Sequence, residues 1–311
     1  MHKKLLRELR DDFSIQELIP LEGGFLNCLW RAGDLLIKQY SPKRFPPHKL
    51  VAIEKALQMQ DLLRRDGIPS PQIFPRDGQM LRWLDEENAY VVMEYSQGWN
   101  ERPESITLTQ MKSLGSHCAE MHQAFARIPP ECVKGYPLDC AQVLENVHNH
   151  ARKVQNLPEC VQSAECRRAV LAMRPILKTL SPTFLENLPQ GICHEDFTPD
   201  NLLFESDELY AIIDFDRSQY SFTWHDIGRA LLSFALLDGV LRREYIAAFV
   251  EGYAAVLPFD RPADALRVTW CIEAPWWIHP RCFAMEPCKA SRYRDEIVWL
   301  TVHWYELDKL I

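Results

Sequence analysis

The sequence predicts an α+β fold in two lobes, with an antiparallel sheet and one helix first and a mainly helical part after it. Apolar runs separated by turn residues fill most of the first 96 positions. Helical periodicity dominates from residue 107 onward. Two short apolar runs interrupt the helical part once, between residues 191 and 216. We therefore expect an N-terminal lobe over 1–96 and a C-terminal lobe over 97–311.

The N-terminal lobe is expected to start with a strand pair. Residues 25–31 and 35–40 are apolar runs on either side of Ala32-Gly33-Asp34. A Gly-Asp pair between two such runs is typical of a hairpin turn. The pattern therefore predicts two antiparallel strands here, followed by a break at the prolines of the next segment.

A helix and a second strand pair are expected to complete this lobe. Over 48–65, leucine and isoleucine recur mostly at three- and four-residue steps, and Asp66-Gly67 then stops the pattern. Residues 79–84 and 89–95 form two more apolar runs around a polar turn. These features predict strands plus one helix for the first 95 or so residues, with helix-rich sequence after them.

The C-terminal lobe is expected to be a set of helices around one small hairpin. The hairpin strands are Leu202–Phe204 and Tyr210–Phe215, joined at Ser206-Asp207. The helices are expected over 107–127, 141–155, 161–179, 224–237, 242–256, 262–274 and 290–308. A hairpin inside a helical lobe is unusual, and the polar residues best suited to catalysis lie in and around it.

The composition is that of an ordinary folded chain and narrows the choice of partners. Of 311 residues, 47% are hydrophobic and 25% are charged, so disorder is not expected. A net charge of −8 disfavours a nucleic-acid partner. Residues 1–13 lack the apolar core of a secretory signal, and no apolar run is long enough to span a bilayer. We expect a cytoplasmic protein with no membrane partner, whose ten cysteines, none in CxxC spacing, are reduced thiols.

Four polar side chains lie in and around the small hairpin. His194, Asp196 and Asn201 precede its first strand, and Asp214 ends its second strand. Antiparallel pairing would bring Asn201 and Asp214 together, and their oxygens are hard ligands that suit magnesium. Asp196 could then accept a proton from an incoming hydroxyl. This pattern favours phosphoryl transfer from a magnesium-bound nucleoside triphosphate.

The same residues resemble the catalytic and metal loops of the aminoglycoside phosphotransferase and choline kinase superfamily. The shared pattern is His194-x-Asp196-x4-Asn201 followed by Ile213-Asp214-Phe215-Asp216. Asp226-Ile-Gly is similar to a later motif of choline and ethanolamine kinases. The resemblance covers about residues 20 to 230 in the right order. It implies a protein-kinase-like fold with Asp196 as base, Asn201 and Asp214 as magnesium ligands, and Asp226 as a brace for the catalytic loop.

The resemblance also implies nucleotide-binding residues in the first lobe. Gly23 and Gly24 look like the turn that covers the triphosphate, where glycines let backbone N–H groups approach phosphate oxygens. Lys38 matches the lysine that contacts the α and β phosphates, and Glu54 matches the glutamate that pairs with this lysine. The backbone of Glu94 and Ser96 would read the adenine edge at the hinge between the lobes.

Several residues keep two interpretations. His194 either shapes the loop through buried hydrogen bonds or takes part in proton transfer, and Asp216 binds either a second metal or the substrate. Glu273, Trp276 and Trp277 either form a cage for an amine through cation–π contact or pack the base of the helical lobe. Glu195 and Asp200 are additional acids in the catalytic loop that could tune affinity for metal or for a cationic acceptor.

The resemblance implies a phosphotransferase that uses ATP, or GTP in its place, with Mg²⁺. The acceptor would be a hydroxyl of a small molecule such as an amino alcohol, an aminoglycoside or homoserine, and acidic residues of the helical lobe fit a cationic one. A protein acceptor is disfavoured because Asp226-Ile-Gly follows Asp214 too soon for an activation segment. The alternative is a non-catalytic binding or structural protein of the kind proposed among spore-coat relatives. The sequence leaves the oligomeric state open.

Overall fold

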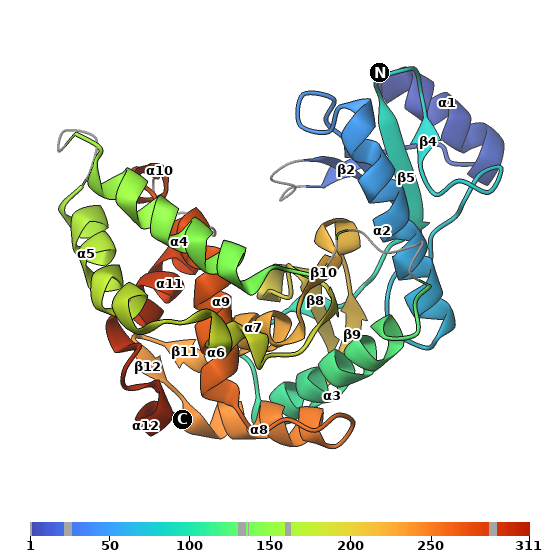
Figure 1. The fold of residues 1–311 in the computed structure, drawn as a ribbon. Coiled ribbons are helices and arrows are strands. Elements are labelled where there is room, and N and C mark those ends of the chain that lie inside the picture. Colours follow the sequence, from blue (N-terminus) through green and yellow to red (C-terminus); the bar gives the residue numbers. More distant parts are fainter. Residues whose placement is uncertain (1, 22–26, 130–134, 136, 159–162, 286–290) are drawn as a thin grey trace.

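The protein has two lobes, as Figure 1 shows: a sheet with two helices, and a larger body of helices below it. The computed structural model describes residues 2–21, 27–129, 135, 137–158, 163–285 and 291–311. The order of elements confirms the predicted α+β class, with an antiparallel sheet before a mainly helical part.

The sheet of the small lobe has five antiparallel strands in the order β1-β2-β3-β5-β4. Its strands are β1 (Ile19–Leu21), β2 (Asn27–Ala32), β3 (Leu35–Tyr40), β4 (Arg82–Trp83) and β5 (Ala89–Glu94). The predicted turn between β2 and β3 is present, and Gly33 adopts a φ of 62°, a left-handed conformation that costs glycine little. The predicted strand over 79–84 is only two residues long.

Two helices cover the two faces of this sheet. Helix α2 (Pro47–Arg65) packs on the face that carries Val91 and Met93, and α1 (His2–Phe13) packs on the face that carries Tyr90 and Val92. Successive residues of β5 point to opposite faces, which is why one strand serves both cores. The sequence predicted α2 closely, whereas α1 was not predicted.

Helix α2 belongs to both lobes. Its Leu50, Ile53 and Leu57 lie in the core beneath the sheet. Its Ala56, Met59 and Leu63 lie in the large core of the helical lobe, on the other side of the helix. The hydrophobic core therefore crosses the predicted boundary at residue 96.

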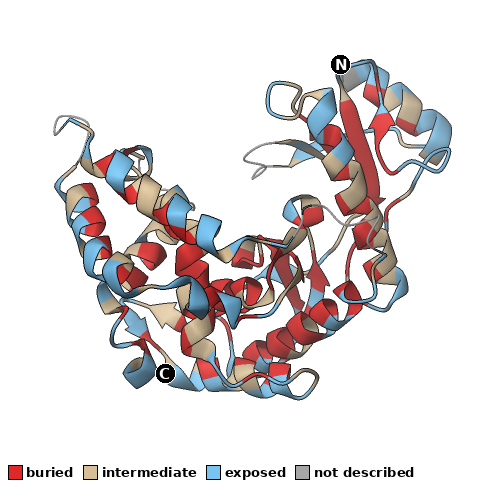
Figure 2. Ribbon diagram, viewed as in Figure 1, coloured by how far each residue is buried: buried red, intermediate tan, exposed pale blue. Residues whose placement is uncertain are grey.

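The large lobe is built from ten helices among the described residues. They are α3 (Leu108–Phe125), α4 (Cys140–Gln155), α5 (Ala164–Thr179), α6 (Pro182–Glu186), α7 (Thr223–Ala235), α8 (Arg243–Ala254), α9 (Pro262–Trp277), α10 (Pro280–Phe283), α11 (Ser291–His303) and α12 (Leu307–Leu310). Figure 2 shows their buried residues gathered in one core. Helices α3 and α8 cross so closely that a Cβ at Gly115 or Gly252 would overlap the backbone of the other helix. Within the described ranges, we find no helix that could cross a membrane.

Three small sheets complete the large lobe. They are β6 (Trp99–Asn100), β8 (Leu202–Glu205) and β9 (Glu208–Ile212) in one sheet, β7 (Gln190–Cys193) with β10 (Gln219–Phe222) in the second, and β11 (Leu236–Leu237) with β12 (Val240–Leu241) in the third. The predicted hairpin is β8–β9, but β9 ends at Ile212. Asp214 therefore follows the strand, where it adopts left-handed dihedrals of φ 63° and ψ 60°.

Candidate active site

The end of the β8–β9 hairpin brings Asn201 and Asp214 to neighbouring positions. The backbone N–H of Ile213 donates to the Asn201 carbonyl at 2.9 Å, which fixes the residue before Asp214 beside Asn201. The side-chain Nδ2 of Asn201 donates to the Asp196 carbonyl at 2.8 Å. With its nitrogen held by the loop, the Oδ1 atom of Asn201 is left as the oxygen that can bind a cation.

Lys38 crosses from the small lobe to the carboxylates of the large lobe. Its Nζ lies 2.7 Å from Asp214 Oδ1 and 2.7 Å from Asp216 Oδ2. The Tyr40 hydroxyl donates to the other oxygen of Asp216 at 3.1 Å. The Asp214 side chain is 43% exposed whereas that of Asp216 is 11% exposed. Asp214 is thus the more accessible carboxylate, and Asp216 holds Lys38 and Tyr40.

The charges of this cluster stabilise one another. Burial on its own would lower the pKa of Lys38, but the carboxylates of Asp214 and Asp216 outweigh it and raise that pKa above its usual range. Burial would raise the pKa of Asp214, and the Lys38 ammonium outweighs it, so this pKa is lowered. Lys38 is therefore cationic and Asp214 anionic near neutral pH.

The expected pair between Lys38 and Glu54 is not formed. The Glu54 carboxylate accepts hydrogen bonds from the backbone N–H groups of Met80 and Leu81 at 2.9 and 2.8 Å. It therefore ties α2 to the segment before β4. The prediction that Glu54 pairs with Lys38 is wrong for this structure, because Asp214 and Asp216 already surround the lysine.

Asp226 supports the loop that carries His194, Glu195 and Asp196. Its carboxylate, completely buried at the start of α7, accepts hydrogen bonds from the backbone N–H groups of His194 and Glu195 at 2.7 and 2.9 Å. The His122 imidazole contacts the same carboxylate at 3.2 Å. This is the arrangement that the resemblance implied for Asp226. The loop needs such support, since Glu195 has a φ of 65°.

His194 is buried and fully engaged in shaping this loop. Its Nε2 lies 3.1 Å from the Ile213 carbonyl, and its Nδ1 accepts from the Asp196 backbone N–H at 3.3 Å. Its ring packs edge-on against Phe215. The contacts favour the loop-shaping interpretation of His194.

Asp226→Asn should destabilise the protein by about 2–3 kcal/mol, because the new amide group would face two buried backbone donors. Burial raises the pKa of Asp226, but the hydrogen bond and charge of His122 outweigh it, so the folded-state pKa lies below the ordinary 3.8. Its contribution to stability is therefore present above pH 3.8 and is lost as the pH falls toward the lowered pKa. Denaturant unfolding at several pH values measures both effects.

Asp260→Asn is the matched control for this prediction, since Asp260 is exposed in the same lobe. Equal unfolding midpoints for the two variants would show that Asp226 does not support the loop.

Asp196 projects from this supported loop. Burial raises the pKa of its carboxyl, with smaller contributions from the negative charges of Asp214 and Glu273, while Arg217 and His194 oppose the shift. The Arg217 guanidinium lies 3.8 Å from Asp196 Oδ1 and is 65% exposed. Asp196 is thus a carboxylate with raised proton affinity beside a largely exposed cation.

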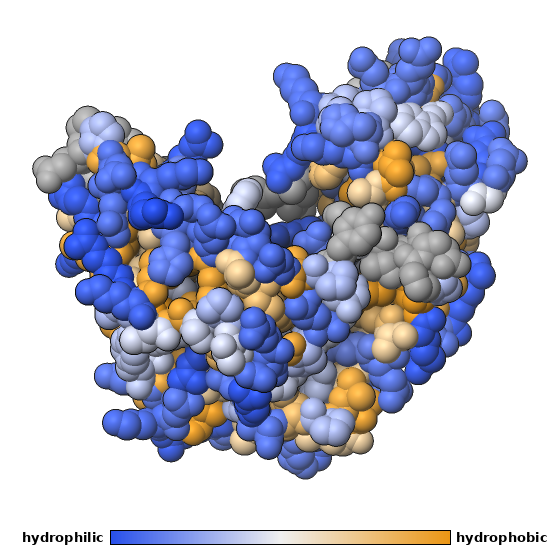
Figure 3. All heavy atoms as spheres, viewed as in Figure 1, coloured by the Kyte–Doolittle hydropathy of each residue, from blue (hydrophilic) through white to orange (hydrophobic). Residues whose placement is uncertain are grey.

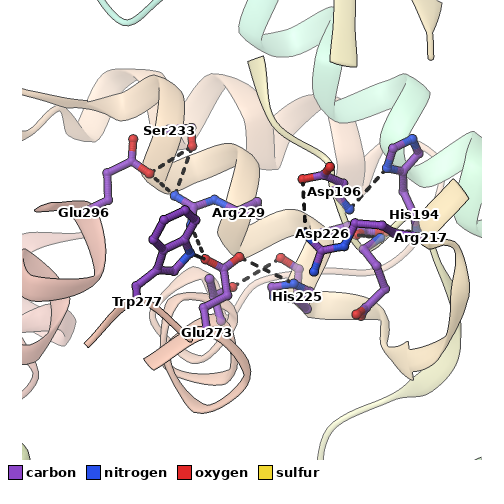
Figure 4. A network of polar contacts seen from close by, with 12 residues as sticks. His194, Asp196, Arg217, His225, Asp226, Arg229, Ser233, Glu273, Trp277 and Glu296 are labelled. Atoms are coloured by element: carbon purple, nitrogen blue, oxygen red, sulfur yellow. Dashed lines mark hydrogen bonds and ion pairs between the residues drawn. The ribbon is translucent and has the colours of Figure 1, made fainter. Parts of the chain in front are cut away.

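Figure 4 shows a polar network in the same lobe, in which Arg229 and Glu273 are the central residues. Glu273 Oε2 accepts from Arg229 Nη1 at 2.7 Å and from Trp277 Nε1 at 2.9 Å. Arg229, only 2% exposed, also bonds Ser233 and pairs with Glu296. Glu273 is therefore not a free acid of an amine cage, as one interpretation required. An amine would have to share it with Arg229.

The two tryptophans beside Glu273 differ in their surroundings. Trp277 packs against Tyr293 of α11 with ring centroids 5.7 Å apart, whereas Trp276 is 69% exposed. Trp277 thus fits the packing interpretation. Trp276 fits neither the core nor a closed cage, because most of its surface is open.

The hinge and the glycine turn are the two segments of the small lobe that were expected to contact the nucleotide. The Glu94 backbone N–H donates to the Gln72 carbonyl at 2.8 Å, so only the carbonyl of Glu94 could read a nucleobase. Ser96 follows on the chain and is half-buried. Gly23 and Gly24 lie outside the described residues. In Figure 3 the surface between the two lobes is deeply hollowed, where a nucleotide is expected to bind.

Sequence reasoning missed several residues of the site. Tyr40 could have been found, because it lies two positions after Lys38 and so shares its face of β3. Arg217 directly follows Asp216. Arg229 and Tyr293 gave no local signal, since their partners are distant in the chain.

A lysine from an antiparallel sheet that faces two aspartates after a β-hairpin, with a further aspartate on a braced loop, defines a protein of the protein-kinase-like class. Residues 17–263 match the model of the phosphotransferase enzyme family. The chain belongs to this phosphotransferase family, which confirms the resemblance to aminoglycoside phosphotransferases.

Curated relatives include homoserine kinases. That of Brucella canis is 31% identical over 213 residues, which make up 68% of this chain and 61% of the relative. That of Brucella ovis is 30% identical over the same span. The match therefore covers less than two thirds of the length of these relatives.

Solved structures share the fold at low sequence identity. A microcompartment-associated aminopropanol kinase has a TM-score of 0.65 and 18% identity, with 99% of both chains covered. A spectinomycin phosphotransferase in complex with ADP and spectinomycin has a TM-score of 0.64 and 14% identity, with 98% of both chains covered.

Proposed function

We propose that this protein transfers the γ-phosphoryl group of ATP to a hydroxyl of a small molecule in a Mg²⁺-dependent reaction. The observation that carries the proposal is the cluster of Lys38, Asp214 and Asp216, with both ion pairs at 2.7 Å, next to the loop of Asp196. Two structures that share the fold hold a nucleotide: ADP in the spectinomycin phosphotransferase, and an ATP analogue with Ca²⁺ in an amicoumacin kinase.

The residues present fit a magnesium ion. Asn201 Oδ1 and the Asp214 oxygen that does not face Lys38 are the candidate ligands. Over the described ranges, no three His, Cys, Asp or Glu side chains form a cluster that could bind a metal. Two protein ligands suit Mg²⁺, which takes its remaining ligands from waters and phosphates. When bound, Mg²⁺ would neutralise charge on the phosphates.

The remaining residues would orient the reactants and move one proton. Lys38, held cationic by its two carboxylates, would bind phosphate oxygens from the small-lobe side. The Asp196 carboxylate would accept the proton of the acceptor hydroxyl as that oxygen bonds to the γ-phosphorus, while the bond from this phosphorus to the β,γ-bridging oxygen breaks and ADP leaves. Arg217, beside Asp196 and largely exposed, could stabilise negative charge on the transferred group. The carbonyl of Glu94 and the backbone of Ser96 would contact the nucleobase.

The polar groups near Asp196 favour a small acceptor with one amine over a polycationic one. Glu273 contributes negative charge at Asp196, but it is already paired with Arg229 at 2.7 Å. Asp200, a second acid that the sequence offered, is paired with Arg102 at 2.7 Å. Relatives that are homoserine kinases and a neighbour that is an aminopropanol kinase act on acceptors of this size. We therefore propose a hydroxy amino acid or an amino alcohol.

The alternative is a kinase-like protein without catalysis. A protein that only binds would not need a cationic Lys38, an accessible Asp214 and a base-like Asp196 together. All three features are present: Lys38 is held cationic, the Asp214 side chain is 43% exposed, and the pKa of Asp196 is raised. This completeness favours catalysis.

Mg²⁺ and ATP together should stabilise the protein by about 2.7 kcal/mol at 100 times the dissociation constant, a shift of about 5 °C in melting temperature. ATP with EDTA should give a smaller shift, because the metal ligands would be unused. GTP in place of ATP tests nucleotide choice. A coupled assay for ADP release, with homoserine, amino alcohols and aminoglycosides in turn, identifies the acceptor. No shift with any Mg²⁺-nucleotide would exclude the proposed function.

A further inference from the structure

The short turn that carries Asn201 is held by the segment that follows the hinge. This turn, Pro199–Asn201, connects the catalytic loop to β8. The Asn100 side chain donates to the carbonyls of Pro199 and Leu202 at 2.8 and 3.1 Å. Because β6 pairs with β8, Asn100 is fixed beside the turn. These bonds hold the backbone of the turn but not its side chains.

The Asp200 side chain is held from two opposite parts of the chain. Arg102, just beyond β6, donates to its Oδ1 at 2.7 Å. Tyr293, in the first turn of α11, donates from its hydroxyl to its Oδ2 at 2.8 Å. Both oxygens of a residue adjacent to Asn201 are thus engaged. Asp200 therefore does not offer a free charge to metal or acceptor, which the sequence had left open.

Tyr293 also belongs to the network around the proposed acceptor side. Its ring packs against Trp277, and the Arg229 guanidinium lies 5.3 Å from the ring centroid. One helical turn later on α11, Glu296 pairs with Arg229, which in turn bonds Glu273. A continuous chain of contacts therefore leads from Glu273 through Arg229 and Tyr293 to Asp200.

We infer that Asp200 is a positioning residue that couples helix α11 to the metal ligand Asn201. The inference rests on the proposed function, because it assumes that Asn201 binds Mg²⁺. Asp200 is held between Arg102 and Tyr293, so a displacement of α11 moves the turn and with it the Asn201 side chain. Occupation of the acceptor side is thereby linked to the affinity of the metal site.

The test measures how binding of a non-hydrolysable ATP analogue depends on Mg²⁺ concentration, by titration calorimetry on the full chain. Tyr293→Phe removes one hydroxyl and keeps the ring, and Asp200→Asn removes the charge and keeps the shape. Both variants should need about threefold to tenfold more Mg²⁺ for half-maximal binding. The double variant should be no worse than Asp200→Asn alone, since both changes break the same link.

Tyr305→Phe and Asp308→Asn are matched controls. Tyr305 is an exposed tyrosine whose hydroxyl contacts Thr179, and Asp308 pairs with Arg267 far from the cleft. They should keep the wild-type Mg²⁺ dependence. The inference is overturned if Tyr293→Phe and Asp200→Asn also keep it, or if they weaken analogue binding equally with and without Mg²⁺. If the wild-type protein binds no analogue at any Mg²⁺ concentration, the proposed function itself fails, and the inference fails with it.

Discussion

Asp196→Asn should lower turnover by about two to four orders of magnitude while nucleotide binding persists, because an amide cannot accept the proton of the acceptor hydroxyl. Asn201 and Asp214 do not depend on the Asp196 carboxylate, since Asn201 bonds only the backbone carbonyl of this residue. Steady-state kinetics with the acceptor found by screening, together with calorimetric nucleotide binding, separates the two effects.

The pH dependence gives a second reading of the same residue. Burial raises the pKa of Asp196, so the fraction of deprotonated base falls at a higher pH than for an ordinary aspartate. The acid limb of the pH–rate profile should therefore lie at a higher pH than it would for an ordinary aspartate. Asp207→Asn, at the exposed turn of the β8–β9 hairpin, is the control and should keep wild-type turnover. A fully active Asp196→Asn enzyme would rule out this residue as the base.

Asp214→Asn should weaken Mg²⁺-dependent nucleotide binding by about tenfold to a hundredfold, because it removes a charged metal ligand. It also removes one of the two partners of Lys38, which then keeps Asp216 alone. Titration calorimetry with and without Mg²⁺ isolates the metal-dependent part. Binding in the absence of Mg²⁺ should change much less.

The same Asp207→Asn variant controls for the loss of one negative charge from the hairpin. Unchanged Mg²⁺-dependent affinity in Asp214→Asn would show that this residue is not a metal ligand. Asp216 would then be the next candidate, although both of its oxygens are engaged.

Most elements of the fold could be predicted from local sequence patterns. Helix α2 was expected over 48–65 and spans 47–65, because its apolar residues recur at three- and four-residue steps and Asp66-Gly67 marks its end. The turn at Gly33 was equally plain. In each case the signal lies within a few residues of the element that it predicts.

Contacts between distant segments were harder to predict. Strands β7 and β10 are four residues each and pair Cys193 with Gln219, so neither is recognisable alone. Helix α1 was missed because its many charges conceal Leu5 and Leu9, which lie one turn apart and are both buried. Glu54 was predicted as the partner of Lys38 from the order of residues in the chain. In the structure, the turn after β9 lies against the sheet and places Asp214 and Asp216 beside Lys38 instead.

In the candidate site too, contacts within one stretch of chain were predicted and contacts between distant segments were not. Asn201, Asp214 and Asp226 lie within one stretch of chain whose spacing determines their arrangement. Glu54 was assigned through a helix whose rotation about its axis the sequence does not fix. Tyr293 and Arg102 reach Asp200 from positions about one hundred residues away in either direction.

Helix α2 limits how freely the two halves of this protein can be exchanged with those of its relatives. One side of this helix packs against the sheet, and the other side packs in the core of the large lobe. Replacing residues 1–96 with those of a relative would remove Ala56, Met59 and Leu63 from the core of the large lobe. The apolar surface that they cover would then be exposed. A substitution in this helix must therefore be compatible with the packing of both lobes at once.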